Sequence, residues 1–406
     1  MFIVSIIIKA QVFFLYSHAF AHKMNKATLY LLIVLIMLPQ IVETIYSPAL
    51  PSLAQAFNVA PHAIAQTLSL YFVGFAFGVL LWGILSDYIG RKPVLLLGLM
   101  LYSLASCAML YVENFYLLLL LRCCTGFAIA VGSVITQTMF RDQLSPAQMI
   151  PIFSIVGVFI AISPSIGLFL GGVLTQWHGY VAVFYFLAIS SGLLCIVTAV
   201  LSTETLSQKP TPPPIVKVVK QLLSDRKVIG YAALITGYNL LIFSYYLKSP
   251  FLFAQHPTAL TWLPYTGILF SIGALLGVML NRYCLNHTQL KWVQLNSKQL
   301  LLMSALICLA ASGLSFKLAN SAYFFVPMIL LMLAYSMAIP ILLAQALSHY
   351  VNYKGIAGAV LGFIYYIAIG LLLEALKWLP NLSLIFSSVS VALLLIMCVM
   401  LKKKCL

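Results

Sequence analysis

The chain has 406 residues, of which 63% are apolar and only 7% are charged. A soluble domain of this length needs a surface on which about a quarter of the residues are charged, so the composition excludes a water-soluble fold and makes lipid the main solvent. The formal net charge of +15 would suit nucleic acid, but the cations are spread between apolar segments, which excludes a single basic binding face.

The apolar segments are continuous rather than alternating, which predicts helices that cross a membrane and not the strands of a barrel. A span needs about 20 apolar residues. We therefore expect an all-α integral membrane protein with twelve spans. They are predicted at residues 28–49, 63–84, 94–112, 115–139, 148–174, 181–201, 228–251, 263–281, 300–317, 322–346, 355–376 and 382–401.

Residues 1–23 precede the first span and are apolar, but Lys9 interrupts them and no small-residue cleavage site follows. We interpret them as an N-terminal extension ahead of a functional start at Met24. An interfacial helix is the alternative interpretation.

The longest polar segment, 202–227, contains the run Pro212-Pro213-Pro214, which cannot continue a helix. This predicted linker divides the chain into residues 24–201 and 228–406, each with six spans. Two six-helix halves are typical of transporters that bind their substrate between the halves, near the middle of the membrane.

The positive charges follow the sides of the membrane. If the N-terminus is cytoplasmic, all but four of the 22 Lys and Arg residues lie in cytoplasmic segments. Such asymmetry is the positive-inside pattern and places both termini in the cytoplasm. The eight cysteines are scattered, with no CxxC pair and no Cys/His cluster, so we expect no metal, no cofactor and no disulfide framework.

Glu43 and Arg122 are the only ionisable side chains predicted deep within the first half. At a rise of about 1.5 Å per residue both lie roughly 10–12 Å below the outer surface. A charge there needs a partner or a wet cavity. Our hypothesis is that Glu43 carries a coupled proton and Arg122 senses its charge state. A fixed ion pair that holds two helices together is the alternative.

A second polar group is predicted at the cytoplasmic ends of the spans. The turn GILSDYIGRKP holds Gly83, Asp87, Gly90, Arg91 and Lys92. Asp142 closes the fourth span on the same side. These residues are expected to form a latch that breaks when the two halves rock against each other; a static surface salt bridge, which would stabilise the fold little, is the alternative.

The turn GILSDYIGRKPVLL resembles the loop-2/3 signature of the major facilitator superfamily. Three further segments resemble the Bcr/CflA-type drug-resistance exporters, a drug:proton antiporter subfamily. They are YSPALPSLAQAFNV from Tyr46, RCCTGFAIAVGSV from Arg122, and the stretch from Asp225 to Phe253. The resemblance covers both halves and implies two six-helix halves related by a pseudo-two-fold axis.

The resemblance also implies an antiporter-type fifth helix. Here that segment keeps Pro164, Gly167, Gly171 and Gly172 but lacks the proline that the family has just after its glycine or alanine. Two other departures concern the fourth helix, where Thr125 replaces a glutamine, and the first helix, where the acid of close relatives would fall at Thr44 rather than Glu43.

Aromatic and basic residues in both halves are candidates for the wall of a substrate cavity, since aromatic faces suit flat amphipathic molecules. The candidates are Tyr46, Tyr71, Phe75, Tyr238, Tyr245, Lys248 and Tyr365. Core packing is the alternative for each aromatic residue. Lys248 could instead extend to the membrane surface, pair with Glu374, or contact an anionic substrate.

No nucleotide-binding motif is found, which leaves the proton gradient as the energy source. We therefore expect a proton-coupled secondary transporter, not an enzyme, that exports drugs or amphipathic small molecules by alternating access across a bacterial inner membrane. Its partners would be the substrate, protons and the lipid bilayer, with no nucleic acid, and we expect a monomer. Export of a dedicated metabolite or siderophore is the alternative. A membrane enzyme or sensor would need a catalytic cluster or an added soluble domain, and the sequence offers neither.

Overall fold

The computed structural model describes residues 25–144, 146–206, 215–255, 262–285, 296–348, 350 and 354–402. The predicted extension, residues 1–23, lies outside this part of the chain. Within it every regular element is helical, as expected for backbone groups that must bond internally in hydrocarbon.

The first group of helices begins at Asn25, whose side chain accepts from the Ala27 N–H and so caps the first turn. This group comprises α2 (Lys26–Ile45), the 3-10 helix η1 (Ser47–Ala49), α3 (Leu50–Ala56), α4 (Pro61–Ile64), α5 (Gln66–Ile89), α6 (Arg91–Met109), α7 (Phe115–Gln143) and α8 (Pro146–Leu201). The second group comprises α9 (Ile215–Ser224), α10 (Arg226–Gln255), α12 (Leu263–Leu285), α13 (Ser297–Leu318), α14 (Pro327–Ala346), α15 (Lys354–Leu376) and α16 (Leu382–Lys402).

Eleven helical segments of the described chain are long and apolar enough to span a membrane. One of them, in α8, is far longer than a bilayer requires and contains non-helical backbone at His178 and Gly179. Its two arms therefore count as two spans, and the predicted twelve-span, all-helical fold class is confirmed. The predicted fifth and sixth spans are these two arms.

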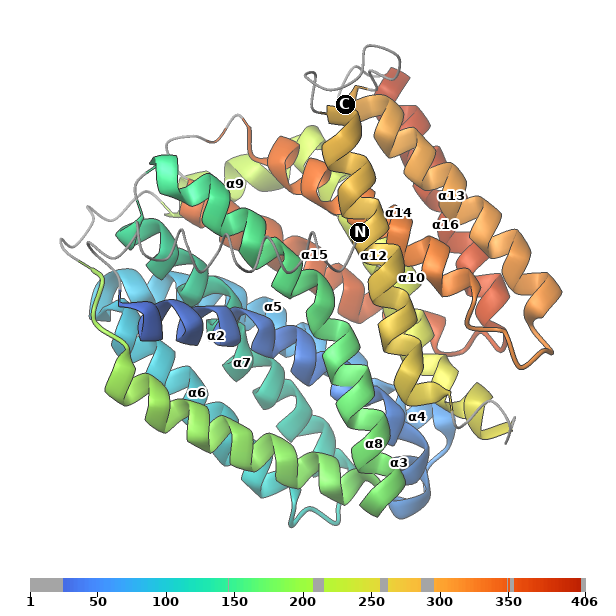
Figure 1. The fold of residues 1–406 in the computed structure, drawn as a ribbon, viewed down its shortest axis with the longest axis horizontal. Coiled ribbons are helices and arrows are strands. Elements are labelled where there is room, and N and C mark those ends of the chain that lie inside the picture. The colour runs from blue at the N-terminus through green and yellow to red at the C-terminus, as the bar shows by residue number, and fades with distance from the viewer. Residues whose placement is uncertain are drawn as a thin grey trace.

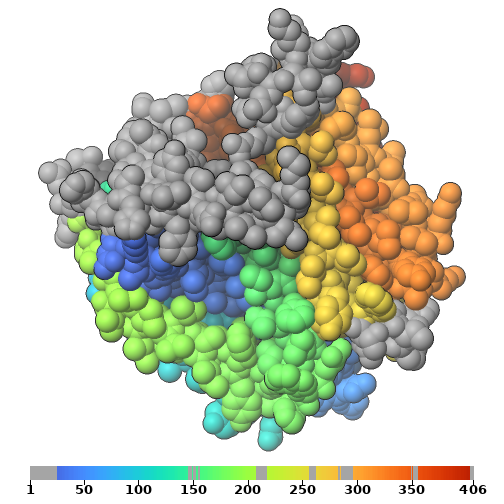
Figure 2. All heavy atoms as spheres, in the orientation of Figure 1, coloured from blue at the N-terminus to red at the C-terminus, as the bar shows by residue number. Residues whose placement is uncertain are grey.

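The helices before the linker (blue to green) gather on one side of the molecule and most of those after it (yellow to red) on the other (Figure 1). Two helix pairs join the sides: α5 packs on α15, and α8 packs on α12. The contact between α8 and α12, which we call the seam, is visible on the surface, where the green atoms of α8 meet the yellow atoms of α12 (Figure 2).

The predicted linker contains a helix, α9, that our sequence analysis did not anticipate. Its apolar residues Val218 and Leu222 are buried, whereas Lys217 and Lys220 are exposed. An apolar stripe beside lysines is the pattern of a helix that lies along a surface. We call the end of the bundle that carries α9 and the end of α8 the linker side, and the opposite end the far side.

Candidate functional site

A cavity of about 990 Å³ lies between the two groups of helices. It is lined by α5, α7, Arg91 of α6 and Met149 of α8 from the first group and by α14, α15 and the residues after α14 from the second. Its lining runs from Arg141 and Asp87, at helix ends on the linker side, to Tyr365 and Tyr366 in the middle of α15. A volume of this size accommodates a drug-sized molecule.

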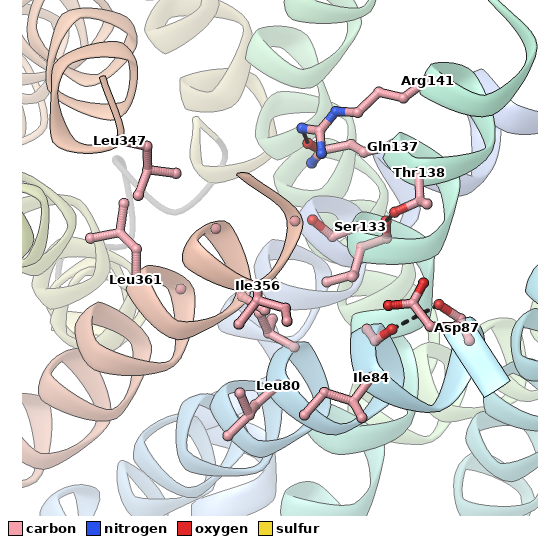
Figure 3. Close-up of a pocket in the computed structure, with 18 of the residues that line it drawn as sticks. Leu80, Ile84, Asp87, Ser133, Gln137, Thr138, Arg141, Leu347, Ile356 and Leu361 are labelled. Atoms are coloured by element: carbon pink, nitrogen blue, oxygen red, sulfur yellow. Dashed lines mark hydrogen bonds between the residues drawn. The ribbon is translucent and has the colours of Figure 1, made fainter. Parts of the chain in front are cut away.

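The two walls of the cavity differ in chemistry. Along α7, Ser133, Gln137 and Arg141 follow one another at four-residue intervals and so share one helix face. Across the cavity the lining from α15 is mostly apolar, with Ile356 and Leu361, and it ends at Tyr365 and Tyr366. Figure 3 shows this arrangement, with Arg141 and Gln137 extending from α7 on one side and Leu347 and Leu361 on the other.

Beside the cavity mouth, Arg91 binds two acids. Its Nη1 lies 2.5 Å from Asp87 Oδ1, and its Nε lies 3.2 Å from Asp142 Oδ2. Nη1 also donates to Ser86 Oγ at 2.8 Å. The predicted association of Asp87, Arg91 and Asp142 is therefore present. All three belong to the first group of helices, so in this conformation the network ties α5, α6 and α7 together and does not cross to the second group.

Lys92, which we also assigned to the latch, donates instead to the carbonyl of Ala199 at 2.9 Å. Gly83 lines the cavity, and Gly90 forms the turn before α6 with a φ of +105°. A side chain is strained at that angle. A Cβ on Gly90 would also lie 2.5 Å from Glu204 Oε2.

Glu204, which lies in the predicted linker, bonds to the backbone of the same turn. Its carboxylate accepts from the backbone N–H groups of Arg91 and Lys92 at 3.0 and 3.1 Å, which caps the start of α6. Burial opposes its charge, but these two bonds and those from Thr205 and Leu206 outweigh burial and hold the pKa of Glu204 below its usual value. A cap that comes from residues far along the chain leaves no local sequence signal.

On the far side the two groups of helices are in direct contact. Ser47 Oγ donates to the carbonyl of Tyr246 at 2.5 Å, and Gln66 Nε2 donates to Glu374 Oε1 at 3.1 Å. The ring of Phe72 lies 4.4 Å from that of Phe243. These contacts close the far side, while the cavity occupies the linker side.

The inner end of the cavity is aromatic. The rings of Tyr365 and Tyr366 lie 4.4 Å apart, and Tyr366 lies 4.6 Å from Phe75. Phe72 stacks on Tyr366 from the far side at 6.2 Å. Because Phe72 and Phe75 belong to α5 and the tyrosines to α15, these rings join the two groups of helices where the cavity stops.

Glu43 and Arg122 lie beyond this aromatic layer, and both are inside the protein rather than facing lipid. Glu43 is 6% exposed and Arg122 is 0% exposed. The guanidinium lies over the rings of Tyr46 and Tyr71, at 3.9 and 4.8 Å from their centroids, and none of its three nitrogens forms a hydrogen bond within the described chain.

Glu43 makes no ion pair with Arg122 in the part of the chain that the structure describes; the ion pairs there involve Arg91 and Lys377. The two side chains are nevertheless close enough to interact electrostatically. Glu43 is also within electrostatic range of Tyr246, Tyr335 and Tyr366 of the second group. Glu43 therefore faces the boundary between the halves.

Of the seven residues predicted to line a substrate cavity, Tyr365 alone lines this one. Tyr46, Tyr71 and Phe75 are buried around Arg122 and the aromatic layer. Tyr238 shares a 2.5 Å hydrogen bond with Ser304, and Tyr245 packs edge-on against Phe270. In the present conformation these aromatic residues pack in the core, which was the alternative interpretation for each of them.

Lys248 donates to the backbone carbonyl of Lys377 at 2.9 Å. Glu374, which we considered as its partner, instead pairs with Lys377, the residue directly after the end of α15. Lys248 thus joins α10 to the end of α15 on the far side, away from the cavity.

The fifth-span glycines lie where α8 contacts its neighbours. A Cβ on Gly167 or Gly171 would collide with α2, at Thr44 and Ile45 respectively, and one on Gly172 would lie 2.7 Å from Pro264 of α12. Small residues let helix backbones approach closely in lipid. Pro164 lies inside the same helix. These residues therefore serve the α8 contacts, including the seam between the halves.

Comparison with known proteins agrees with this architecture. Residues 14–372 match the model of the Major Facilitator Superfamily. An uncharacterized transporter of Rickettsia bellii is 30% identical over 85% of this chain and 88% of its own length. A bicyclomycin resistance protein homolog of Haemophilus influenzae is 26% identical over 49% of this chain and 51% of its own. Multidrug resistance protein D of Escherichia coli is 28% identical over 42% of this chain and 43% of its own length.

Twelve spans in two groups, a cavity between them and a charged turn between the second and third spans are thus found in a chain whose relatives are named as transporters. The arrangement is that of a carrier and not of an enzyme. The chain belongs to the major facilitator superfamily.

Proposed function

We propose that this transporter exports drugs or other amphipathic small molecules in exchange for protons, as a member of the Bcr/CflA-type subfamily. The relatives named for bicyclomycin and multidrug resistance support the substrate class. Transport would proceed by alternating access, in which the cavity closes on the linker side as the far side opens.

The observation that carries proton coupling is the buried Glu43 beside a wholly buried Arg122. An unpaired cation in an apolar interior is costly, and so is an unpaired carboxylate. Neither has a direct ionic partner within the described chain, yet each is within the electrostatic range of the other. Protonation of Glu43 would therefore remove the negative charge that stabilises the Arg122 guanidinium. The protein would then have two charge states of different energy.

The position of Glu43 supports a link between its charge and the conformation. Its neighbours Tyr246 and Tyr366 belong to the second half, and Tyr366 also lines the cavity. Separation of the halves on the far side would expose Glu43 to water from that side. The carboxyl would then exchange its proton with the far compartment, whereas the cavity would exchange its contents with the linker side.

The network of Asp87, Arg91 and Asp142 is proposed as the conformational latch. In the present conformation it holds the ends of α5, α6 and α7 as one body. When the cavity closes, α15 would approach this body at Gly83, where a Cβ added to the glycine would already lie 3.8 Å from the Cβ of Ala359. The charges at the mouth would then meet the second half.

The protein is proposed to reside in a bacterial inner membrane with the linker side and both termini in the cytoplasm. The support is the distribution of Lys and Arg, since all but four of the 22 fall on that side if the spans alternate as predicted. The cavity would then face the cytoplasm, from which an exporter collects its substrate.

Transport in everted vesicles from a host without its own efflux pumps tests the proposal. Uptake of a drug panel should require an imposed pH gradient, and addition of a transported drug should release protons from the vesicle lumen. Glu43→Gln should abolish both the gradient dependence and the proton release, because the amide cannot exchange a proton.

Glu113→Gln is the matched control, since Glu113 is an exposed acid in the loop before α7. It should transport like the parent protein. If Glu43→Gln still follows the pH gradient, Glu43 has no coupling role. If the parent protein moves a single metabolite or siderophore and no drug, the dedicated-cargo alternative holds instead.

A further inference from the structure

Among the described residues that line the cavity, one cation forms no ion pair with a carboxylate. Four charged residues line it: Asp87, Arg91, Arg141 and Asp142. Arg91 binds both acids, and Asp142 Oδ2 accepts a further hydrogen bond from Thr205 Oγ1 at 3.1 Å. Arg141 directly precedes Asp142 in the sequence but forms no ion pair with it. Adjacent residues on a helix point in different directions, which explains the separation.

The guanidinium of Arg141 is held by one long hydrogen bond, 3.5 Å from Nη2 to Gln137 Oε1. That bond orients the Gln137 side chain so that its oxygen is engaged and its NH₂ group is left to donate. One turn further into the cavity, Ser133 makes no side-chain hydrogen bond with a described residue. Arg141, Gln137 and Ser133 thus present unused N–H and O–H groups along one face of α7.

The opposite wall is largely apolar, apart from the hydroxyls of Ser348, Tyr365 and Tyr366. Leu80 and Ile84 of α5, and Leu347, Ile356 and Leu361 of the second half, are apolar (Figure 3). A ligand that fills the cavity would therefore place acceptor atoms against α7 and apolar surface against α5 and α15. Guanidinium groups favour carboxylates because two parallel N–H groups can meet both oxygens.

We propose that the substrate is an amphipathic organic anion, with Arg141 and Gln137 holding its carboxylate and the leucine and isoleucine wall holding its apolar body. This inference rests on the proposed export function and narrows it to one charge class. Cationic compounds would meet Arg141 at the mouth and find both acids already bound by Arg91. Neutral compounds would gain the apolar contact but not the charged one.

Two dyes with the same xanthene ring system and opposite charge separate these cases: carboxyfluorescein, an anion, and rhodamine 123, a cation. Binding of each to the purified full chain is measured by fluorescence anisotropy, and uptake of each is measured in everted vesicles with a pH gradient. The parent protein should bind carboxyfluorescein more tightly than rhodamine 123.

Arg141→Gln should weaken carboxyfluorescein binding about tenfold or more, because hydrogen bonds to charged groups contribute that much, and should change rhodamine 123 binding by about twofold or less. Arg141→Lys keeps the charge without the two-pronged geometry and should bind the anion with intermediate strength. In transport the loss in Arg141→Gln should appear in KM, not in the maximal rate. Lys220→Gln, which removes an exposed cation of α9 outside the cavity, should leave both dyes unaffected.

Tighter binding of rhodamine 123 than of carboxyfluorescein by the parent protein would overturn the proposal. The proposal would also be overturned if Arg141→Gln, at normal protein levels, weakened the binding of both dyes equally. It would be overturned as well if Lys220→Gln weakened carboxyfluorescein binding as much as Arg141→Gln does. Because binding is read without transport, an anion that binds but does not move with the pH gradient leaves this inference standing and counts against the proposed exchange with protons.

Discussion

The two ends of the bundle are held by different kinds of contact. On the linker side the charged network of Arg91 lies within the first half, and a cavity lies between α7 and α15. On the far side hydrogen bonds and aromatic rings connect the halves directly, as between Ser47 and Tyr246. Hydrogen bonds between the halves are thus described on the far side, whereas the ionic network at the open end lies within one half.

This difference suggests how a symmetric bundle can alternate. Bonds that lie within a half survive a rocking motion, while bonds between the halves must break and form again. The bonds described between the halves on the far side join Ser47 to Tyr246 and Gln66 to Glu374. Glu374 is also paired with Lys377 of its own half, so these bonds can separate without leaving that charge unpaired. The ionic network does not cross to the second half in this conformation, so its proposed role as a latch concerns the state in which the cavity closes and the second half approaches it.

The largest expected difference between the two ends is in access to water. In a variant with the eight natural cysteines replaced by serine, Ser133→Cys should react with a polar maleimide about tenfold or more faster than Ser69→Cys, because only solvated thiolates react quickly. Ser133 lines the cavity, whereas Ser69 is 2% exposed on the side where α5 packs on α15. Mass spectrometry of intact protein measures the rates. Equal rates would mean that the far end is open, and the comparison would fail.

A smaller effect is expected from Gly90→Ala, which places a Cβ at a φ of +105° and against Glu204. The strain should cost about 1–3 kcal/mol and lower the apparent Tm in detergent. Gly313→Ala, at a helical glycine with no atom within 4 Å of an added Cβ, should be neutral or stabilise by about 1 kcal/mol or less. An equal change in both variants would show that the turn before α6 is not strained.

The smallest effect is expected from the acid that caps α6. Because the pKa of Glu204 is lowered in the folded protein, its contribution is present at neutral pH and is lost as pH falls from about 4 through the folded pKa. Glu204→Gln should lower stability by less than about 1 kcal/mol at pH 7, since Glu204 is largely exposed. Between pH 7 and pH 3 the apparent Tm of the variant should fall less steeply with pH than that of the parent protein. An identical dependence of Tm on pH would exclude the cap.

Several features of the fold could be predicted because each depends on a short stretch of sequence. Twelve apolar segments of the right length are sufficient to predict twelve spans, and the helices from α5 to α16, apart from α9, occur near the expected residues. The association of Arg91 with Asp87 was predictable because the two residues lie one helical turn apart. The helix α9 was missed because three prolines nearby favoured an irregular linker.

Residues that act through distant partners could not be predicted in this way. Glu204 caps a helix that begins more than a hundred residues earlier, and Lys248 bonds to Lys377 rather than to the acid one turn before it. Tyr238 and Tyr245 were candidates for a cavity wall by residue type, but their burial depends on which face of α10 meets α13 and α12.

The sequence by itself determined that this protein crosses a membrane, how many times it does so, and where ionisable groups would have to be explained. It could do so because lipid imposes its constraints on each segment separately: every span must be long, apolar and internally hydrogen-bonded. Only the tertiary structure decided which end of the bundle is closed, that Arg122 lies on two tyrosines, and that Arg141 faces the cavity. Those facts depend on how helices rotate and approach one another, and packing between distant segments sets that rotation.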